Sequence, residues 1–180
     1  MYGIVNQAIE DLVRETFGED VWEKVLATSG VEEKYFVSTE PYSDDVTYKL
    51  AGAAAEVTGL SLQDVLRSFG EWWILHTATE HYGGLLKAGG SQLAHFLRHL
   101  PAFHDRVALM YPRLTPPEFQ VSNETERSIY VHYKSQREGL QDFVHGLMVG
   151  LGKLYDTPVQ VTHLHTKQEG NGYDIFEVSW

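Results

Sequence analysis

The chain has 180 residues, no cysteine and a formal net charge of −11 at pH 7. The acidic balance argues against binding to nucleic acid or to an anionic membrane, and the lack of cysteine excludes disulfides, thiolate metal sites and cysteine nucleophiles. No basic, apolar leader opens the chain, and no apolar run is long enough to span a bilayer. We therefore expect one cytoplasmic domain.

The first part of the chain has the apolar periodicity of helices. One helix is expected over residues 2–17 and ends at a glycine. Asp20 followed by Glu23 has the spacing of a capping box, which predicts a second helix up to Gly30. The next stretch, residues 31–41, is expected to be a loop.

Two serine caps predict the helices that follow. Ser43 precedes an alanine-rich helix that runs to Val57, and Ser61 precedes a helix whose apolar positions continue to His76. A glycine-rich break then comes before a long helix over residues 91–111. The glycines of the break are Gly83, Gly84, Gly89 and Gly90.

Beyond these helices, alternation replaces helical spacing. Pro112, Pro116 and Pro117 end the helical region, and one further helix is expected over residues 140–154. Strands are expected over residues 119–121, 128–133, 159–165 and 173–178, with turns at 123–126 and 170–172.

The order of these elements sets the fold class. A helical half followed by a β-β-α-β-β unit is the arrangement of an α+β domain. We predict a mainly helical lobe over residues 1–60, packed on a lobe over residues 61–180 that carries a four-stranded antiparallel sheet with an embedded helix. No repeat or linker divides the chain, so residues 1–180 are expected to form a single domain.

One strand face ends in hydrogen-bond donors. Tyr133, Ser135 and Arg137 continue the alternation of Ile129 and Val131, so all five side chains share one face of an extended chain. Arginine suits a carboxylate because its planar fork binds both oxygens. Two interpretations remain: the donors converge on the carboxylates or phosphates of an apolar ligand, or the strand runs out into solvent.

A second feature is a single imidazole on an apolar helix. His104 is flanked at helical spacing by Leu97, Leu100, Val107, Ala108 and Tyr111. Either His104 is a core histidine that is hydrogen-bonded to a backbone carbonyl, or it is an axial metal ligand in an apolar pocket.

Three further patterns are less specific. Trp73 lies on an apolar stripe, and its indole N–H needs a partner if it is buried. Gly146 and Gly150 have the spacing that lets a flat ligand or another backbone approach a helix. Two histidine pairs lack a third ligand and are weak zinc candidates; they are His95 with His99, and His163 with His165.

An imidazole on an apolar helix and a separate set of carboxylate-binding donors together fit haem, which has an iron, a flat apolar ring and two propionates. Without cysteine, the axial ligand would be histidine. The competing interpretation is a haem-free interaction domain, in which His104 is a core residue and Arg137 lies on the surface. No hydrolase, kinase or dinucleotide-binding fingerprint is present.

Several motifs also support a family assignment. The sequence resembles the haem–nitric oxide/oxygen binding (H-NOX) domains over essentially its whole length, and it is similar to the haem domain of the soluble guanylate cyclase beta subunit. The matching segments are Met1-Tyr2-Gly3 with Asn6, YSDDVTY from Tyr42, Phe69-Gly70, LPAFHDRV from Leu100, Pro116-Pro117, the Y-x-S-x-R motif from Tyr133 and EGLQD from Glu138.

The resemblance implies roles for individual residues. His104 is expected to be the proximal ligand of a haem b iron, and Tyr133, Ser135 and Arg137 are expected to hold the propionates. The other residues expected in the haem pocket are Val5, Trp73, Leu100, Pro117, Phe143 and Leu147.

The resemblance also implies a ligand preference. Phe143 matches the position where oxygen-binding members have a distal tyrosine, and a phenyl ring donates no hydrogen bond to bound oxygen. We therefore expect a non-enzymatic sensor of nitric oxide and carbon monoxide that excludes oxygen. An oxygen-binding member or a haem enzyme is the alternative, for which Trp73 or His76 would supply the polar group.

The expected signal is a conformational change. Binding of nitric oxide is expected to weaken the bond to His104, to flatten the haem against Pro117 and to shift the helix that carries the histidine. The chain resembles stand-alone bacterial members, so its expected partner is a separate protein such as a histidine kinase or a diguanylate cyclase.

Overall fold

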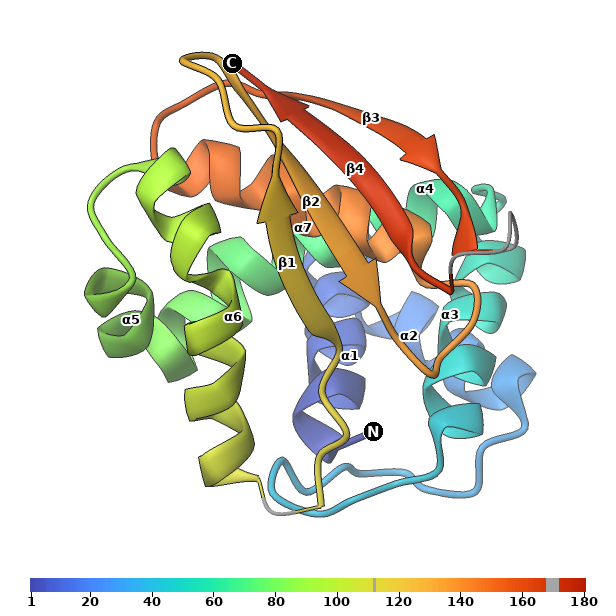
Figure 1. Cartoon of the computed structure of the whole chain (residues 1–180). Coiled ribbons are helices and arrows are strands. Elements are labelled where there is room, and N and C mark those ends of the chain that lie inside the picture. The colour runs from blue at the N-terminus through green and yellow to red at the C-terminus, as the bar shows by residue number, and fades with distance from the viewer. Residues whose placement is uncertain (112, 168–171) are drawn as a thin grey trace.

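Residues 1–111, 113–167 and 172–180 are described by a computed structural model (Figure 1). Pro112 and the first two positions of the turn expected at residues 170–172 lie outside the described residues. The elements are α1 (Gly3–Phe17), α2 (Glu19–Ser29), α3 (Asp44–Thr58), α4 (Leu62–Trp72), the π-helical turn η1 (Trp73–Ala78), α5 (Thr79–Ala88), α6 (Leu93–Met110), β1 (Glu118–Ser122), β2 (Ser128–Lys134), α7 (Gln141–Leu154), β3 (Gln160–His165) and β4 (Asp174–Ser179).

The four strands form one antiparallel sheet in the order β1-β2-β4-β3. Its inner face is apolar because Ile129 and Val131 of β2 pair with Val178 and Phe176 of β4, and all four side chains are buried. Helix α7 lies behind this face, and α6 runs beside β1 (Figure 1). The predicted α+β class, with a four-stranded antiparallel sheet and an embedded helix, is confirmed.

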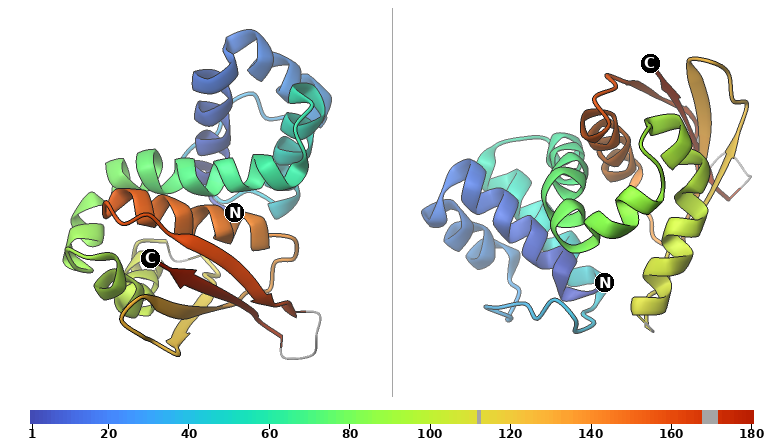
Figure 2. Two further views of the ribbon diagram at one scale, coloured as in Figure 1. Left: turned by 90° about the horizontal axis from the view of Figure 1, so that it is seen from above. Right: turned by 90° about the vertical axis from the view of Figure 1, so that its left-hand side faces the viewer.

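Two apolar clusters make up the interior. One joins α1, α2, α3 and α4 and includes the fully buried Trp22 and Leu50. The other lies between α6, α7 and the sheet and includes Phe96. Val5 and Trp73 pack against both clusters, so these residues stand where the two parts of the interior meet. Seen from above, α4 and α7 lie side by side between the N-terminal helices and the sheet (Figure 2).

Glycines bring α4 and α7 into backbone contact. A Cβ atom on Gly70 would lie 2.1 Å from the carbonyl oxygen of Phe143, and one on Gly146 would lie 2.1 Å from that of Arg67. Gly150 faces η1 in a similar way. The glycine spacing in α7 therefore lets the backbone of another helix approach, which is one of the two possibilities that the sequence indicates.

The serine caps are confirmed. Ser43 Oγ accepts a hydrogen bond from the backbone N–H of Asp45 at 3.3 Å, and Ser61 Oγ accepts one from that of Asp64 at 3.1 Å. Each cap satisfies an amide that has no partner within its helix. Helices α3 and α4 therefore begin where the sequence predicts.

Three predicted boundaries are wrong. Helix α2 begins before Asp20, because Gly18 with a φ of +93° turns the chain there, and no capping box forms. Gly83 and Gly84 lie inside α5, which is kinked beside them at Tyr82 (φ −125°, ψ 15°), and the full break between helices comes only after Ala88. Helix α6 begins at Leu93 rather than at residue 91.

The helix expected to continue through His76 changes its winding at Trp73, where η1 begins. A π-helical turn inserts extra residues into the helix and changes which side chains share a face. His76 stacks on Trp72, with ring centroids 3.7 Å apart. No helix in the described part of the chain is both long and apolar enough to cross a membrane.

Candidate functional site

An apolar cavity opens between the N-terminal helices and the sheet-bearing part of the chain. It contains about 1020 Å³ of empty space, its opening included. Its walls come from α1, η1, α5, α6, α7, the loop before β1, β1 itself and the end of β2. The predicted site residues that line it are Val5, Trp73, His104, Pro117, Tyr133, Arg137, Phe143 and Leu147.

His104 faces this cavity as a neutral imidazole. The carbonyl oxygen of Leu100 lies 3.0 Å from His104 Nδ1. Burial lowers the pKa of His104 and outweighs the raising effects of this hydrogen bond and of Asp105. A neutral ring that donates from Nδ1 carries its lone pair on Nε2, which is then available to a metal atom.

Leu100 itself is placed differently from the prediction. Its side chain is buried in the apolar cluster of α6, α7 and the sheet, and it is not part of the cavity lining. Because it precedes His104 by about one helical turn, its backbone carbonyl is the group that contacts the histidine. Leu100 therefore orients the imidazole through the main chain.

The wall formed by α1, η1 and α7 is mainly aromatic and aliphatic. The ring of Phe143 lies 4.8 Å from that of Phe69, and Trp73 stands edge-on to Phe69 at 6.3 Å. Phe143 offers no hydrogen-bond donor, whereas Trp73 has an indole N–H with no partner among the described contacts. His76, the other polar candidate, stacks on Trp72 and is not part of the lining.

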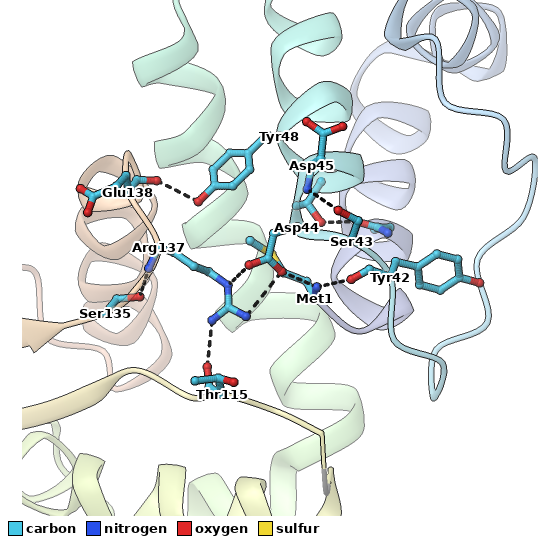
Figure 3. A network of polar contacts seen from close by, with 12 residues as sticks. Met1, Tyr42, Ser43, Asp44, Asp45, Tyr48, Thr115, Ser135, Arg137 and Glu138 are labelled. Atoms are coloured by element: carbon cyan, nitrogen blue, oxygen red, sulfur yellow. Dashed lines mark hydrogen bonds and ion pairs between the residues drawn. The ribbon is translucent and has the colours of Figure 1, made fainter.

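On the cavity lining, Arg137 joins three segments of the chain (Figure 3). Its Nε lies 2.8 Å from Asp44 Oδ2, and its Nη1 donates to the carbonyl oxygen of Thr115 at 2.8 Å. The Met1 ammonium donates to the same Asp44 carboxylate at 2.5 Å. Burial alone would raise the pKa of Asp44, but the hydrogen bonds from Met1 and Arg137 outweigh burial and lower it.

Of the three donors predicted to share one face of β2, only Tyr133 lies on the strand. Tyr133 is buried on that face, but β2 ends at Lys134, so Ser135 and Arg137 lie in the following loop. Ser135 is not part of the cavity lining, and its Oγ accepts a hydrogen bond from the backbone N–H of Arg137 at 3.1 Å. Burial raises the pKa of Tyr133, against the lowering effects of Ser135 and Arg137. The phenol therefore remains a donor at neutral pH.

Sequence reasoning missed the partner of Arg137 and a tyrosine contact on the cavity wall. Asp44 lies 93 positions before Arg137, and although it belongs to the matching segment YSDDVTY, no role is assigned to it from the sequence. The hydroxyl of Tyr82 donates to that of Tyr111 at 2.8 Å, and Tyr2 packs edge-on to Tyr111 at 4.8 Å. No local spacing relates these residues, so no sequence signal predicts either contact.

The histidine pairs do not form a metal centre in the part of the chain that the structure describes. His99 Nδ1 lies 2.8 Å from the carbonyl oxygen of His95, and His163 Nε2 pairs with Asp174 Oδ1 at 2.9 Å. No group of three histidine, aspartate or glutamate residues in the described ranges could hold a metal ion.

The sequence can be compared with those of known proteins. A family model described as Haem-NO-binding matches residues 2–163. Soluble guanylate cyclase gcy-31 of Caenorhabditis elegans is 26% identical over 95% of this chain and 24% of its own length. Soluble guanylate cyclase gcy-35 of the same organism is 29% identical over 94% of this chain and 25% of its own length. The chain thus spans about a quarter of the length of these relatives.

Solved structures share the fold along the whole chain. The Fe(II) unliganded H-NOX protein from K. algicida has a TM-score of 0.86 at 25% identity, with 99% of this chain and 96% of that chain covered. The H-NOX protein from S. oneidensis in the Fe(II)NO state has a TM-score of 0.87 at 20% identity, with 99% and 98% covered.

Proposed function

Since the chain belongs to the haem-NO-binding (H-NOX) family of haem-based gas sensors, we propose that it senses nitric oxide and carbon monoxide at a ferrous haem b bound by His104. H-NOX domains are sensor domains rather than catalytic ones. The observation that carries the proposal is the position of two features on one apolar cavity: an imidazole on α6, and an arginine that binds a carboxylate.

The cavity residues fit haem in three respects. His104 presents the unprotonated Nε2 of a neutral imidazole, which is a common ligand of haem iron. The lining around it, which includes Pro117 and Leu147, is apolar and suits a porphyrin face. Tyr133 and Arg137 are donors suited to propionates, and the Arg137 guanidinium already holds the carboxylate of Asp44. When bound, haem would supply a ferrous iron with one position open to a diatomic gas.

In this proposal, the wall with Phe143 and Trp73 sets the choice of gas. Oxygen bound to ferrous iron becomes polarised and is stabilised by a hydrogen-bond donor, whereas nitric oxide and carbon monoxide depend on one much less. Phe143 has no donor and packs on Phe69. The wall therefore favours nitric oxide and carbon monoxide over oxygen.

Stable oxygen binding is the second candidate function, and one observation favours it. Trp73 lines the same cavity, and its indole N–H donates to no protein group among the described contacts. If this N–H reaches a bound gas, it replaces the missing tyrosine. Trp73→Phe removes this donor and keeps an aromatic ring, so it separates the two candidate functions.

We propose that α6 carries the signal to a separate partner protein, such as a histidine kinase or a diguanylate cyclase. The end of α6 beyond His104 exposes Leu109 and Met110, which are 84% and 49% accessible. Tyr111 follows and is bound by Tyr82 of α5. A displacement of His104 would therefore shift an apolar surface relative to α5, which gives a partner two states to distinguish.

The absorption spectrum of the purified, reduced protein tests this function. We expect haem to bind, air to leave the ferrous spectrum unchanged, and nitric oxide to change it. A stable oxygen complex that Trp73→Phe abolishes would establish the second candidate instead. Failure to bind haem after reconstitution would overturn both.

A further inference from the structure

The loop that follows β2 lacks the support of a sheet. Residues 135–138 contain two of the three proposed propionate-binding residues, yet β2 ends at Lys134 and the strand ladder does not extend to them. Side chains hold this loop instead. On one side, the hydroxyl of Tyr48 donates to the carbonyl oxygen of Glu138 at 2.8 Å (Figure 3).

On the other side, one lysine holds both ends of the loop. Lys167 Nζ donates to the carbonyl oxygen of Ser135 at 2.8 Å and to Glu138 Oε1 at 2.5 Å. The lysine side chain is 24% exposed, whereas that of Glu138 is 70% exposed. An exposed ion pair adds little stability, so the charge-assisted bond to the Ser135 carbonyl is the contact that fixes the loop.

Lys167 is in turn held by a buried carboxylate. Asp174 is 8% exposed, and its Oδ1 accepts hydrogen bonds from the backbone N–H of Lys167 at 3.2 Å and from His163 Nε2 at 2.9 Å. The His163 ring lies flat on Phe176 at 4.5 Å. The backbone of Lys167 is therefore anchored to β4 through Asp174.

These residues lie directly behind the carboxylate-binding side chains. Lys167, Asp174 and His163 line a polar pocket whose wall also includes Tyr133 and Arg137. Tyr133 and Arg137 line the apolar cavity as well, so they separate the two spaces. Lys167, Asp174 and His163 therefore share a pocket with two of the propionate-binding residues while lying outside the lining of the apolar cavity.

We propose that Lys167, oriented by Asp174, is a positioning residue for propionate binding. Its ammonium fixes the Ser135 carbonyl, and the Ser135 hydroxyl accepts the backbone N–H of Arg137. Loss of the ammonium frees the loop, and the guanidinium then spends less time in the geometry that holds a carboxylate. This inference rests on the proposed haem binding and adds residues that do not touch the haem.

The test is the rate at which the reduced holoprotein loses haem to excess haem-free myoglobin. Lys167→Met is expected to lose haem about tenfold faster, Lys167→Arg to restore the slow rate, and Asp174→Ala, which removes the acceptor, to follow Lys167→Met. Lys134→Met is the matched control, because it makes the same change at a lysine that forms an ion pair with Glu118 in which both side chains are exposed. The control is expected to match the parent protein.

A double-mutant cycle separates positioning from general stability. In a protein that already carries Arg137→Met, Lys167→Met is expected to raise the rate of haem loss by a smaller factor than in the parent protein, because part of its effect passes through the Arg137 side chain. Full additivity, or an unchanged rate in Lys167→Met, would overturn the inference while haem binding stands. If the parent protein binds no haem, the proposed function itself fails, so the two failures are distinguishable.

Discussion

Phe143→Tyr tests the proposed gas preference with a single added oxygen atom. The Phe143 ring lines the apolar cavity and packs 4.8 Å from Phe69. A hydroxyl on this ring adds a donor to a wall whose described polar group is the indole of Trp73. We expect the variant to form a ferrous oxygen complex and the parent protein to form none.

The size of the effect follows from the surroundings of the ring. A hydrogen bond to a polarised group in an apolar site contributes about 1.5–3 kcal/mol, which corresponds to a roughly 10- to 100-fold gain in oxygen affinity. Carbon monoxide is less polarised and should gain much less. In the absence of a gas, the same hydroxyl is buried without an acceptor, so the free energy of unfolding should fall by about 1 kcal/mol.

The assay is a titration of the ferrous protein with oxygen and, separately, with carbon monoxide, followed by absorbance. Phe143→Leu is the control, because it removes the ring without adding a donor and should gain no oxygen affinity. Equal gains for both gases, or no gain for oxygen, would refute the reasoning that a missing donor on this wall excludes oxygen.

Three further predictions concern the folded chain and are checked by urea unfolding. Arg137→Met loses the contacts with Asp44 and with the loop before β1, and should lower the free energy of unfolding by about 1–2 kcal/mol. The pKa of Asp44 is lowered from 3.8 in the folded protein, so the ionised carboxylate contributes its full stabilisation above pH 3.8, and this stabilisation is lost as the pH falls through the lowered pKa. Asp44→Asn should therefore have a smaller free energy of unfolding than the parent protein at pH 7. Between about pH 4 and 2 its free energy of unfolding should fall by less than that of the parent protein. Gly70→Ala puts a Cβ 2.1 Å from a carbonyl oxygen of α7 and should cost about 2–3 kcal/mol, whereas Gly52→Ala, with no atom within 4 Å, should gain up to about 1 kcal/mol. An equal effect of the two glycine changes, or the same acid response with and without Asp44, would contradict these assignments.

Local chemistry made most of the fold predictable from the sequence. Ser43 and Ser61 satisfy amides that every helix leaves unpaired, so their positions mark α3 and α4. Alternation at Ile129, Val131 and Tyr133 predicts the buried face of β2, because successive side chains of a strand point to opposite faces. These signals act over a few residues and therefore appear directly in the sequence.

Features decided by tertiary contacts were not predictable in this way. Gly83 and Gly84 predict a helix break, but the chain only kinks beside them at Tyr82 and continues as α5 to Ala88. Among the site residues, the sequence predicts the position of His104 on an apolar helix, but it does not predict the contact between Arg137 and Asp44. That contact depends on how the N-terminal helices sit against the sheet, which no local pattern records.

The resonance Raman spectrum of the reduced protein tests most directly whether His104 binds a haem iron. We expect an iron–histidine stretching band that shifts when histidine is labelled with heavy nitrogen. In His104→Gly this band should be absent, and free imidazole should restore an iron–imidazole band. If His104→Gly keeps the original band without imidazole, another residue binds the iron and the assignment of His104 is wrong.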